Sequence, residues 1–145
     1  MCLSTLMTSA RIAEKDITCY KIMWRNKGMH RGKYCSWVRC FKYELGMSYH
    51  EQSFCNRIEK NYHGFVDVHY GFHSYIYYQD AHRIMTSLRD LYENKVVVLL
   101  KCTIPAGSQY YISQDDIEFC SDKIIIKAQY VKGKWVESFP SVQEK

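Results

Sequence analysis

Residues 96–103, with the sequence VVVLLKCT, decide the fold of this chain. Apolar side chains fill consecutive positions here, so an extended strand would be apolar on both of its sides. Such a strand is typical of the centre of a sheet that is covered on both faces. We therefore predict a central strand over residues 96–103 and expect the other strands to be arranged around it.

Several other segments alternate, or carry many β-branched and aromatic residues, which favours further strands. They span residues 17–23, 41–45, 65–70, 72–78, 109–113, 124–131 and 135–139. In the first of these segments, alternation places Ile17, Cys19, Lys21 and Met23 on one side of the strand. Gly71 separates two of the segments, and we expect a bend or bulge there.

One principal helix is expected from Asp80 to about Asn94. Apolar residues recur at helical spacing in this segment, Asp80 suits an N-cap, and Asn94 can end the helix. Residues 48–61 allow a second short helix, because Phe54 and Ile58 lie at helical spacing. The sequence thus predicts an α+β fold, with a strand-dominated mixed or antiparallel sheet and one principal helix.

The composition fits one globular domain spanning residues 1–145. Hydrophobic residues make up 47% of the chain and charged residues 24%, which excludes a disordered chain. No apolar run approaches the length of a membrane helix, and the first residues lack the basic and apolar regions of a secretory signal. We therefore expect a cytoplasmic protein with no membrane partner.

The seven cysteines and six histidines give no metal or disulfide pattern. No pair of cysteines has the close spacing of zinc ribbons, and Cys19, Cys102 and Cys120 lie in apolar stretches that predict buried thiols. His69 and His73 have helical ligand spacing but fall in predicted strands, where that spacing does not place them on one face. The sequence therefore predicts reduced cysteines and no metal site.

The net charge of +5 comes from one basic segment, because no acidic residue lies between Asp16 and Glu44. Its seven cations are Lys21, Arg25, Lys27, Arg31, Lys33, Arg39 and Lys42, and its aromatic residues are Trp24, Tyr34, Trp37, Phe41 and Tyr43. Cations neutralise phosphates and aromatic rings stack on unpaired bases, so single-stranded nucleic acid or a nucleotide is a candidate partner. The alternative is an exposed loop whose aromatic side chains point into the core.

We predict a binding surface that joins this segment to the tyrosine-rich strand after Gly71. Its residues are Arg25, Lys27, Arg31, Lys33, Trp37, Arg39, Tyr43, His73 and Tyr75.

Four segments of the chain resemble a family of small uncharacterised proteins found in phage genomes and in bacteria such as Bacteroides. They are residues 19–21 (CYK), 40–49 (CFKYELGMSY), 71–75 (GFHSY) and 121–126 (SDKIII). The family pattern reads Y-K, F-x-Y-E-x-G-x-x-Y, G-F-H and D-K-I-x-I in this order. The resemblance implies a small phage- or prophage-type accessory protein in the cytoplasm of a bacterial host, without implying an activity.

A fainter resemblance exists to the ADP-ribosyltransferase superfold. Tyr20 and Lys21 match its opening strand, His73 lies in its glycine-led second strand, and residues 97–111 match its strand, P-x-G, strand segment. The resemblance implies NAD as cofactor and a catalytic cleft formed by Tyr20, Lys21, His73 and Asp122. The chain departs from the superfold at Asp122, where those enzymes carry a catalytic glutamate.

The leading functional hypothesis is therefore a binding module for nucleic acid or a nucleotide. An NAD-dependent enzyme with a degenerate catalytic strand is the first alternative. An enzyme should gather its four cleft residues around one cavity, whereas a binding module should scatter them. A structural virion component is the other alternative, and it should show a large apolar patch and a symmetric oligomer.

Overall fold

The computed structural model describes residues 3–5, 9–28, 30–37, 41–52, 54, 58–60, 66–68 and 70–140. The first elements in chain order are β1 (Leu3–Thr5), β2 (Arg11–Ile12), β3 (Ile17–Asn26), β4 (Lys33–Cys35), β5 (Lys42–Glu44), β6 (Ser48–His50), β7 (Ile58–Lys60) and β8 (Val66–Val68). They are followed by β9 (Phe72–Tyr75), α1 (Tyr78–Leu91), β10 (Lys95–Ile104), β11 (Gln109–Ile112), β12 (Glu118–Ser121), β13 (Lys123–Val131) and β14 (Lys134–Val136).

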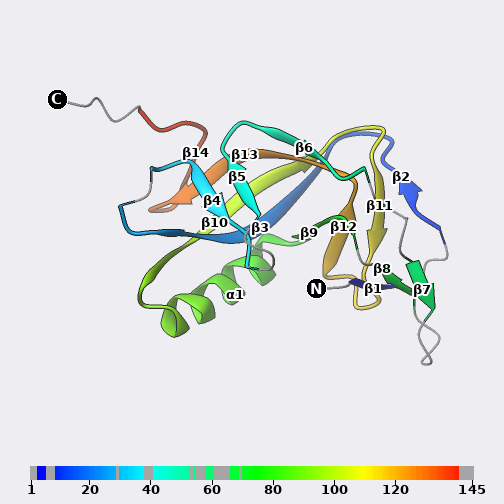
Figure 1. The fold of residues 1–145 in the computed structure, drawn as a ribbon, viewed down its shortest axis with the longest axis horizontal. Helices are drawn as coiled ribbons and strands as arrows, with labels where there is room; N and C mark the ends of the chain where they lie inside the picture. Colours follow the sequence, from blue (N-terminus) through cyan, green and yellow to red (C-terminus); the bar gives the residue numbers. More distant parts are fainter. Residues whose placement is uncertain are drawn as a thin grey trace.

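The described strands pair antiparallel throughout and form two sheets (Figure 1). The larger sheet has eleven strands, with the order β14-β13-β10-β3-β9-β12-β11-β2 and with β4, β5 and β6 attached beside this path. The smaller sheet has the order β1-β8-β7. Within the described residues, the predicted dominance of strands and the single helix are confirmed, and the sheet is antiparallel.

The predicted central strand is confirmed as β10, which lies between β3 and β13. It pairs with β3 over ten consecutive positions, from Lys95↔Asn26 to Ile104↔Ile17. Its pairing with β13 shifts register between Lys101 and Cys102. Because this pairing is long and unbroken, the β3–β10 pair forms the middle of the large sheet.

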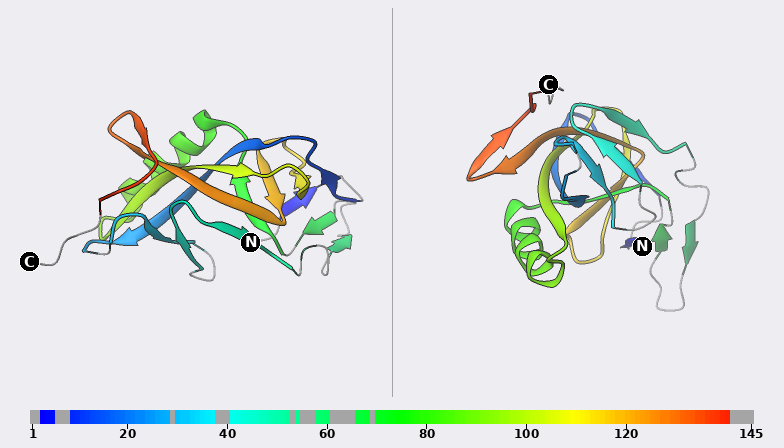
Figure 2. Two further views of the ribbon diagram at one scale, coloured as in Figure 1. Left: turned by 90° about the horizontal axis from the view of Figure 1, so that it is seen from above. Right: turned by 60° about the vertical axis from the view of Figure 1, so that its left-hand side comes forward.

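The two faces of the β3–β10 pair are covered by different parts of the chain. Helix α1 packs on one face, where Ile22 and Leu99 are buried with Met85. The opposite face carries Cys19, Met23 and Leu100 into a second apolar cluster with the β4–β5 hairpin. Figure 2 shows α1 and β4 on opposite sides of the long strands. This two-sided cover explains why β10 has apolar side chains at consecutive positions.

The helix starts two residues earlier than its predicted N-cap. Tyr77 is the N-cap residue and makes no side-chain capping bond, and Asp80 lies within the first turn. There the Asp80 carboxylate lies 3.2 Å from the Arg83 guanidinium. The predicted capping role of Asp80 is therefore wrong, because the acid instead faces the positive end of the helix dipole. Among the described residues, no helix is long and apolar enough to span a bilayer.

The second short helix is absent from the described part of residues 48–61. Phe54 lies in a turn, and Ile58 begins β7. Earlier in the segment, β6 pairs with β13 through Ser48↔Ile125 and Tyr49↔Ile124. Strand pairing along an existing edge satisfies backbone groups that an isolated short helix would leave exposed, so tertiary context overrides the local spacing.

Candidate functional site

The candidate site lies beside a gap in the pairing of β3. On this edge, β3 pairs with β9 at Tyr20↔Tyr75 and with β4 at Trp24↔Cys35. Between these two points, Lys21, Ile22 and Met23 have no strand partner on that edge among the described residues. Because β9 and β4 diverge from each other here, the gap opens into a cavity.

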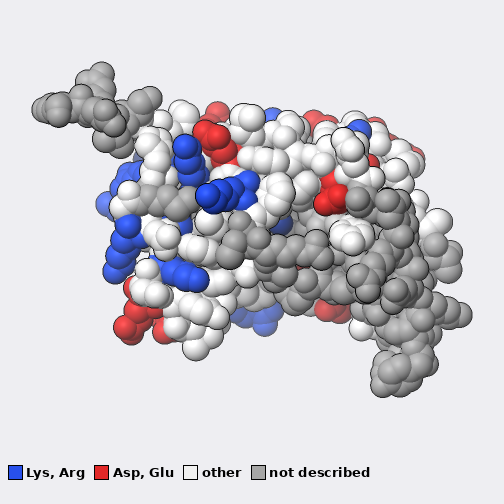
Figure 3. All heavy atoms as spheres, viewed as in Figure 1, with Lys and Arg blue, Asp and Glu red and all other residues white. Residues whose placement is uncertain are grey.

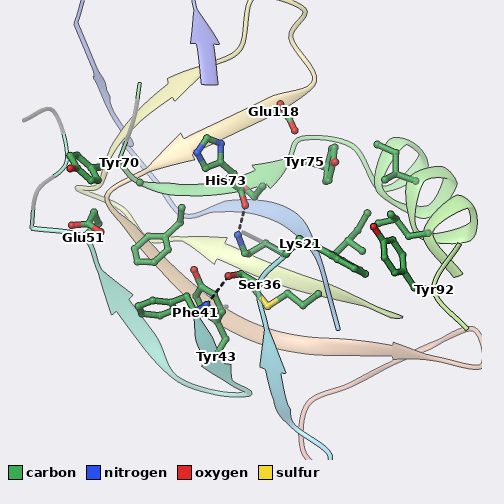
Figure 4. Close-up of a pocket in the computed structure, with 18 residues that line it drawn as sticks. Lys21, Ser36, Phe41, Tyr43, Glu51, Tyr70, His73, Tyr75, Tyr92 and Glu118 are labelled. Atoms are coloured by element: carbon green, nitrogen blue, oxygen red, sulfur yellow. Dashed lines mark hydrogen bonds between the residues drawn. The ribbon is translucent and has the colours of Figure 1, made fainter. Parts of the chain in front are cut away.

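The cavity has a volume of about 470 Å³ and is walled by β3, β9, α1 and four residues of the basic segment, Ser36, Trp37, Phe41 and Tyr43 (Figure 4). Aromatic side chains dominate its lining: Trp37, Phe41, Tyr43, Tyr70, Phe72, Tyr75 and Tyr92. Polar groups come from Lys21, His73, Ser36, Ser74, Glu51 and Glu118. A largely aromatic wall with a few polar groups is the usual make-up of a small-molecule site, and the volume falls in the usual range.

Lys21 is the most unusual residue of the cavity, because its side chain is buried with only 8% of the residue exposed. Its Nζ donates a hydrogen bond to the backbone carbonyl of His73 and lies 5.5 Å from the centre of the Tyr43 ring (Figure 4). None of the ion pairs between described residues involves Lys21. Burial lowers the pKa of this amine, opposed chiefly by the nearby thiol of Cys102.

His73 contributes its backbone and its ring to different neighbours. Its carbonyl accepts the bond from Lys21, and its Nε2 lies 3.9 Å from the Cys120 Sγ. Burial, and then the charge of Lys21, lower the pKa of the ring from 6.5 to about 4. The imidazole is therefore neutral near pH 7.

Gly71 allows the cavity wall to pass close to a small apolar cluster formed by Phe54, Val68, Tyr111 and Cys120. Its φ is 141°, and an added Cβ would lie 2.5 Å from the Cys120 Sγ and 3.0 Å from the Phe54 ring. Glycine therefore fits for two reasons, since a side chain is disfavoured both by the backbone conformation and by lack of space. The bend expected at this position is confirmed.

Three further polar groups belong to residues that line the cavity. The Trp37 Nε1 is buried and has no hydrogen-bond partner among the described residues. The hydroxyl of Ser74, which is 2% exposed, has no nitrogen or oxygen partner there and interacts with the Cys19 thiol. Burial, followed by the charge of Asp115, raises the pKa of the Glu118 carboxyl, while Lys21 opposes this. The wall thus offers two donors and one acid besides Lys21.

The structure separates the four cleft residues that the ADP-ribosyltransferase resemblance implied. Lys21 and His73 are hydrogen-bonded at the cavity. Tyr20 lies on the opposite face of β3, with its ring 5.9 Å from those of Tyr78 and Trp135. Asp122 is buried elsewhere, where it accepts a 2.9 Å bond from the Gln109 amide and lies 3.9 Å from the His50 Nε2. Neither Tyr20 nor Asp122 lines the cavity.

The predicted binding residues fall into two groups. The four uncharged ones, Trp37, Tyr43, His73 and Tyr75, all line the cavity. The cations are placed elsewhere: Lys27, Arg31 and Lys33 are exposed, Arg25 is partly exposed, and Arg39 lies outside the described residues. Figure 3 shows Lys and Arg side chains gathered at the end of the molecule where β4 lies.

Most aromatic residues of the basic segment are packed rather than presented to solvent. Tyr34 is fully buried and donates a 2.7 Å bond to Gln129, and Trp24 is covered by the Lys95 ammonium at 4.0 Å. Phe41 remains 49% exposed. The alternative interpretation, with aromatic side chains turned inward, therefore describes Tyr34 and Tyr43, whereas Phe41 is available for stacking.

The buried thiols predicted at Cys19, Cys102 and Cys120 are confirmed, since each residue has 0% exposure. The described cysteines, which include Cys35, carry free thiols. Cys2, Cys40 and Cys55 lie outside the described residues, as do His63 and His69.

Sequence reasoning missed the cavity residues Ser36, Glu51, Tyr70, Ser74 and Tyr92 as members of a site. For Tyr92 a signal existed, because it continues the helical stripe of Ile84 and Leu88, which also line the cavity. The others come from loops or short strands whose position depends on tertiary pairing.

The chain matches no protein-family model, and no curated protein or solved structure is significantly similar to it. The geometry of the site is therefore the basis for assigning a function to this protein.

Proposed function

We propose that this protein is a binding module whose cavity holds a small planar ligand with a hydrogen-bond acceptor directed at Lys21. A nucleobase or nucleotide belongs to this class of ligand, and so do aromatic carbonyl compounds. The observation that carries the proposal is a buried amine, without an ion pair among the described residues, in a cavity lined by aromatic rings.

The energetic cost of this arrangement supports a binding role. Burying an amine without a counter-ion destabilises the folded chain, and an apolar residue would fill the position at lower cost. The carbonyl of His73 takes one hydrogen of the amine, and the rings of Tyr43 and Phe72 supply apolar surroundings. A ligand with an acceptor atom would complete the hydrogen bonding of Lys21 and bury its own ring against the wall.

The aromatic lining favours planar ligands for a geometric reason. The rings of Phe41, Tyr43 and Tyr49 already contact one another at centroid distances of 4.8 to 6.0 Å. Aromatic pairs at such distances stabilise stacked or edge-on arrangements by about 0.5–1.5 kcal/mol each. A planar ligand can extend this cluster into the cavity, whereas a bulky aliphatic ligand cannot stack.

The test is a ligand titration followed by tryptophan fluorescence, because Trp37 lines the cavity. Benzamide, benzoate and adenosine monophosphate are the probes, and cyclohexanecarboxamide is the non-planar control. We expect at least one planar probe to bind and the control not to bind. Lys21→Met should weaken this binding at least about tenfold, the effect of one lost charged hydrogen bond. Lys127→Met, at an exposed strand position, should leave it unchanged.

If no planar probe binds, or if Lys21→Met and Lys127→Met bind equally, the cavity is not the site of function.

Single-stranded nucleic acid is a second candidate partner, supported by the exposed cations Lys27, Arg31 and Lys33 and by the exposed ring of Phe41. Fluorescence anisotropy with a labelled oligonucleotide at two salt concentrations tests it. Binding should fall by orders of magnitude with salt if several phosphates are engaged. Arg31→Glu with Lys33→Glu should weaken it, while each change alters stability by only about 0.5 kcal/mol. Absence of binding at low salt discards this partner.

The wider biological setting stays a proposal as well. We place the protein with the phage-type accessory proteins that its sequence resembles, in the cytoplasm of a bacterial host. The NAD-dependent alternative has less support, because Tyr20 and Asp122 lie away from the cavity. The virion alternative also lacks support, since the most exposed apolar residues, Leu91 and Ile12, come from separate elements.

A further inference from the structure

We infer that the Lys21 amine forms an imine with an aromatic aldehyde held in the cavity. This inference rests on the proposed binding function and names a covalent chemistry for the same cavity. Lysines that form imines with carbonyl compounds are activated by apolar surroundings that keep part of the amine unprotonated.

The geometry gives an aldehyde access to the amine while excluding other lysines. Lys21 projects from the middle of β3, and its Nζ meets the cavity between the His73 carbonyl and the Tyr43 ring (Figure 4). Among the described residues, no other lysine lines this cavity. Its volume of about 470 Å³ suits a ligand with one or two rings.

The hydrogen bond to His73 is compatible with a neutral, nucleophilic amine. A neutral amine keeps two hydrogens and one lone pair, so it can donate to the carbonyl and still attack a carbon atom. The titratable groups that act on Lys21 are the thiols of Cys19, Cys102 and Cys120 and the carboxyl of Glu118. His73 and Tyr43 also adjoin it, and its pKa is lowered because burial outweighs the thiols and the acid.

The reaction balances without any oxidant or reductant. The nitrogen lone pair attacks the aldehyde carbon, the π electrons move to oxygen, and one proton passes from nitrogen to oxygen to give a carbinolamine. The hydroxyl then leaves as water after it takes a proton, and the remaining N–H proton is released. Glu118 lines the same cavity and can give and take that proton, because burial raises the pKa of its carboxyl from the ordinary range toward neutral pH.

The experiment uses benzaldehyde with sodium cyanoborohydride at pH 7, which reduces an imine to a stable benzylamine. Peptide mapping by mass spectrometry then gives the extent of labelling at every lysine of the intact chain. Only a small fraction of an ordinary lysine is unprotonated at pH 7, and each unit by which the pKa falls raises that fraction about tenfold. We expect Lys21 to be labelled at least about tenfold faster than exposed lysines such as Lys127.

Two further measurements separate this inference from the proposed function. Benzyl alcohol has the same ring without the aldehyde, and its binding is followed by tryptophan fluorescence. Binding of benzyl alcohol without preferential labelling of Lys21 would overturn the imine and leave the binding role intact. If benzyl alcohol and the planar probes all fail to bind, the binding role fails.

A variant and a competition provide the controls. Lys21→Met should remove the fast labelling and leave the slow labelling of exposed lysines. Benzamide, which occupies the cavity without forming an imine, should slow the labelling of Lys21 in the wild-type chain. Mapping of the wild-type chain with this competitor decides the question even if Lys21→Met does not fold. Labelling spread evenly over the lysines, or unaffected by a planar probe that binds in the fluorescence titration, would contradict the inference.

Discussion

The two faces of the β3–β10 pair are both buried, but they differ in what they hold. On the face beneath α1, Ile22, Val97 and Leu99 pack against Ala81 and Met85, and the buried residues of this cluster are all apolar. On the other face, Lys21 lies among apolar neighbours beside a cavity. The buried residues of the first face are all apolar, whereas the second face carries a buried lysine. The cavity lies at the edge of β3 and borders both faces, because Ile22 also lines it. The buried lysine is therefore the feature that distinguishes the second face from the first.

The largest expected effect is the loss of stability when one buried leucine is truncated on either face of the β3–β10 pair. Leu99 and Leu100 are adjacent on β10, both have 0% exposure, and they point to opposite faces. Leu99→Ala and Leu100→Ala should each lower the free energy of unfolding by about 2–5 kcal/mol, measured by urea denaturation. Leu91→Ala is the control, because Leu91 is 73% exposed. If Leu99→Ala lowered the free energy of unfolding no more than Leu91→Ala does, helix α1 would not cover this face of the sheet.

The next effect concerns the wall of the cavity at Gly71. Gly71→Ala adds a Cβ that would overlap the Cys120 Sγ, on a backbone with φ 141°. We expect a loss of about 2–4 kcal/mol, combining backbone strain with overpacking. Gly107→Ala is the matched control, since Gly107 also has a positive φ but nothing lies within 4 Å of the added atom. There the loss should be about 1–2 kcal/mol. Equal losses would show that the close approach at Gly71 is unimportant.

A smaller effect of opposite sign is expected at Lys21. Because the amine is buried without an ion pair among the described residues, Lys21→Met should raise the free energy of unfolding by up to about 2 kcal/mol at pH 7. The pKa of Lys21 is lowered in the folded chain, so between that value and 10.5 only the unfolded chain binds the proton. Wild-type stability therefore rises with pH across this window, and the advantage of the variant shrinks.

Urea denaturation at several pH values measures this advantage as the difference between variant and wild type. A variant less stable than wild type at pH 7, with a pH-independent difference, would give Lys21 a structural role and remove the contrast between the two faces.

The effect that is smallest at pH 7, and that grows only in acid, is a pH dependence at His73. Its pKa is lowered to about 4 in the folded chain, so between pH 6.5 and 4 the unfolded chain binds a proton that the folded chain does not. Stability should therefore fall as the pH falls through this range. His73→Gln should flatten the fall in thermal melts recorded across it, and His30→Gln, at an exposed position, is the control. Parallel curves for His73→Gln and wild type would show that the ring is not protected from protonation.

The accuracy of the sequence-based prediction differed between the long and the short elements. The unbroken apolar run of β10 needs cover on both faces wherever it lies, so its central position could be predicted. The apolar stripe of α1 could likewise be predicted from helical spacing. Short strands such as β4 and β6 have too few residues to show a clear alternation of apolar and polar side chains. Their positions are set by pairing with β3 and β13. The pairing of β6 with β13 also places residues 48–50, within the range where a short helix was expected, in a strand.

For the site, alternation along β3 already placed Lys21 beside Cys19 and Met23 on one side of the strand. That pattern was local and could be read from the sequence, because side chains of a strand alternate between two faces. The sequence also supplied the aromatic residues Trp37, Tyr43 and Tyr75. It could not show that these rings line one cavity. They come from three separate segments, and the cavity forms where β9 and β4 leave part of one edge of β3 unpaired.

The sequence by itself thus determined which residues are apolar, where the long strands and the helix form, and which side of β3 carries the lysine. These properties follow from side-chain periodicity, which is local. Only the tertiary structure decided that this side faces a cavity, that Lys21 is buried there, and that Tyr20 and Asp122 lie elsewhere. Burial and long-range pairing depend on how distant segments meet, and no local pattern specifies that.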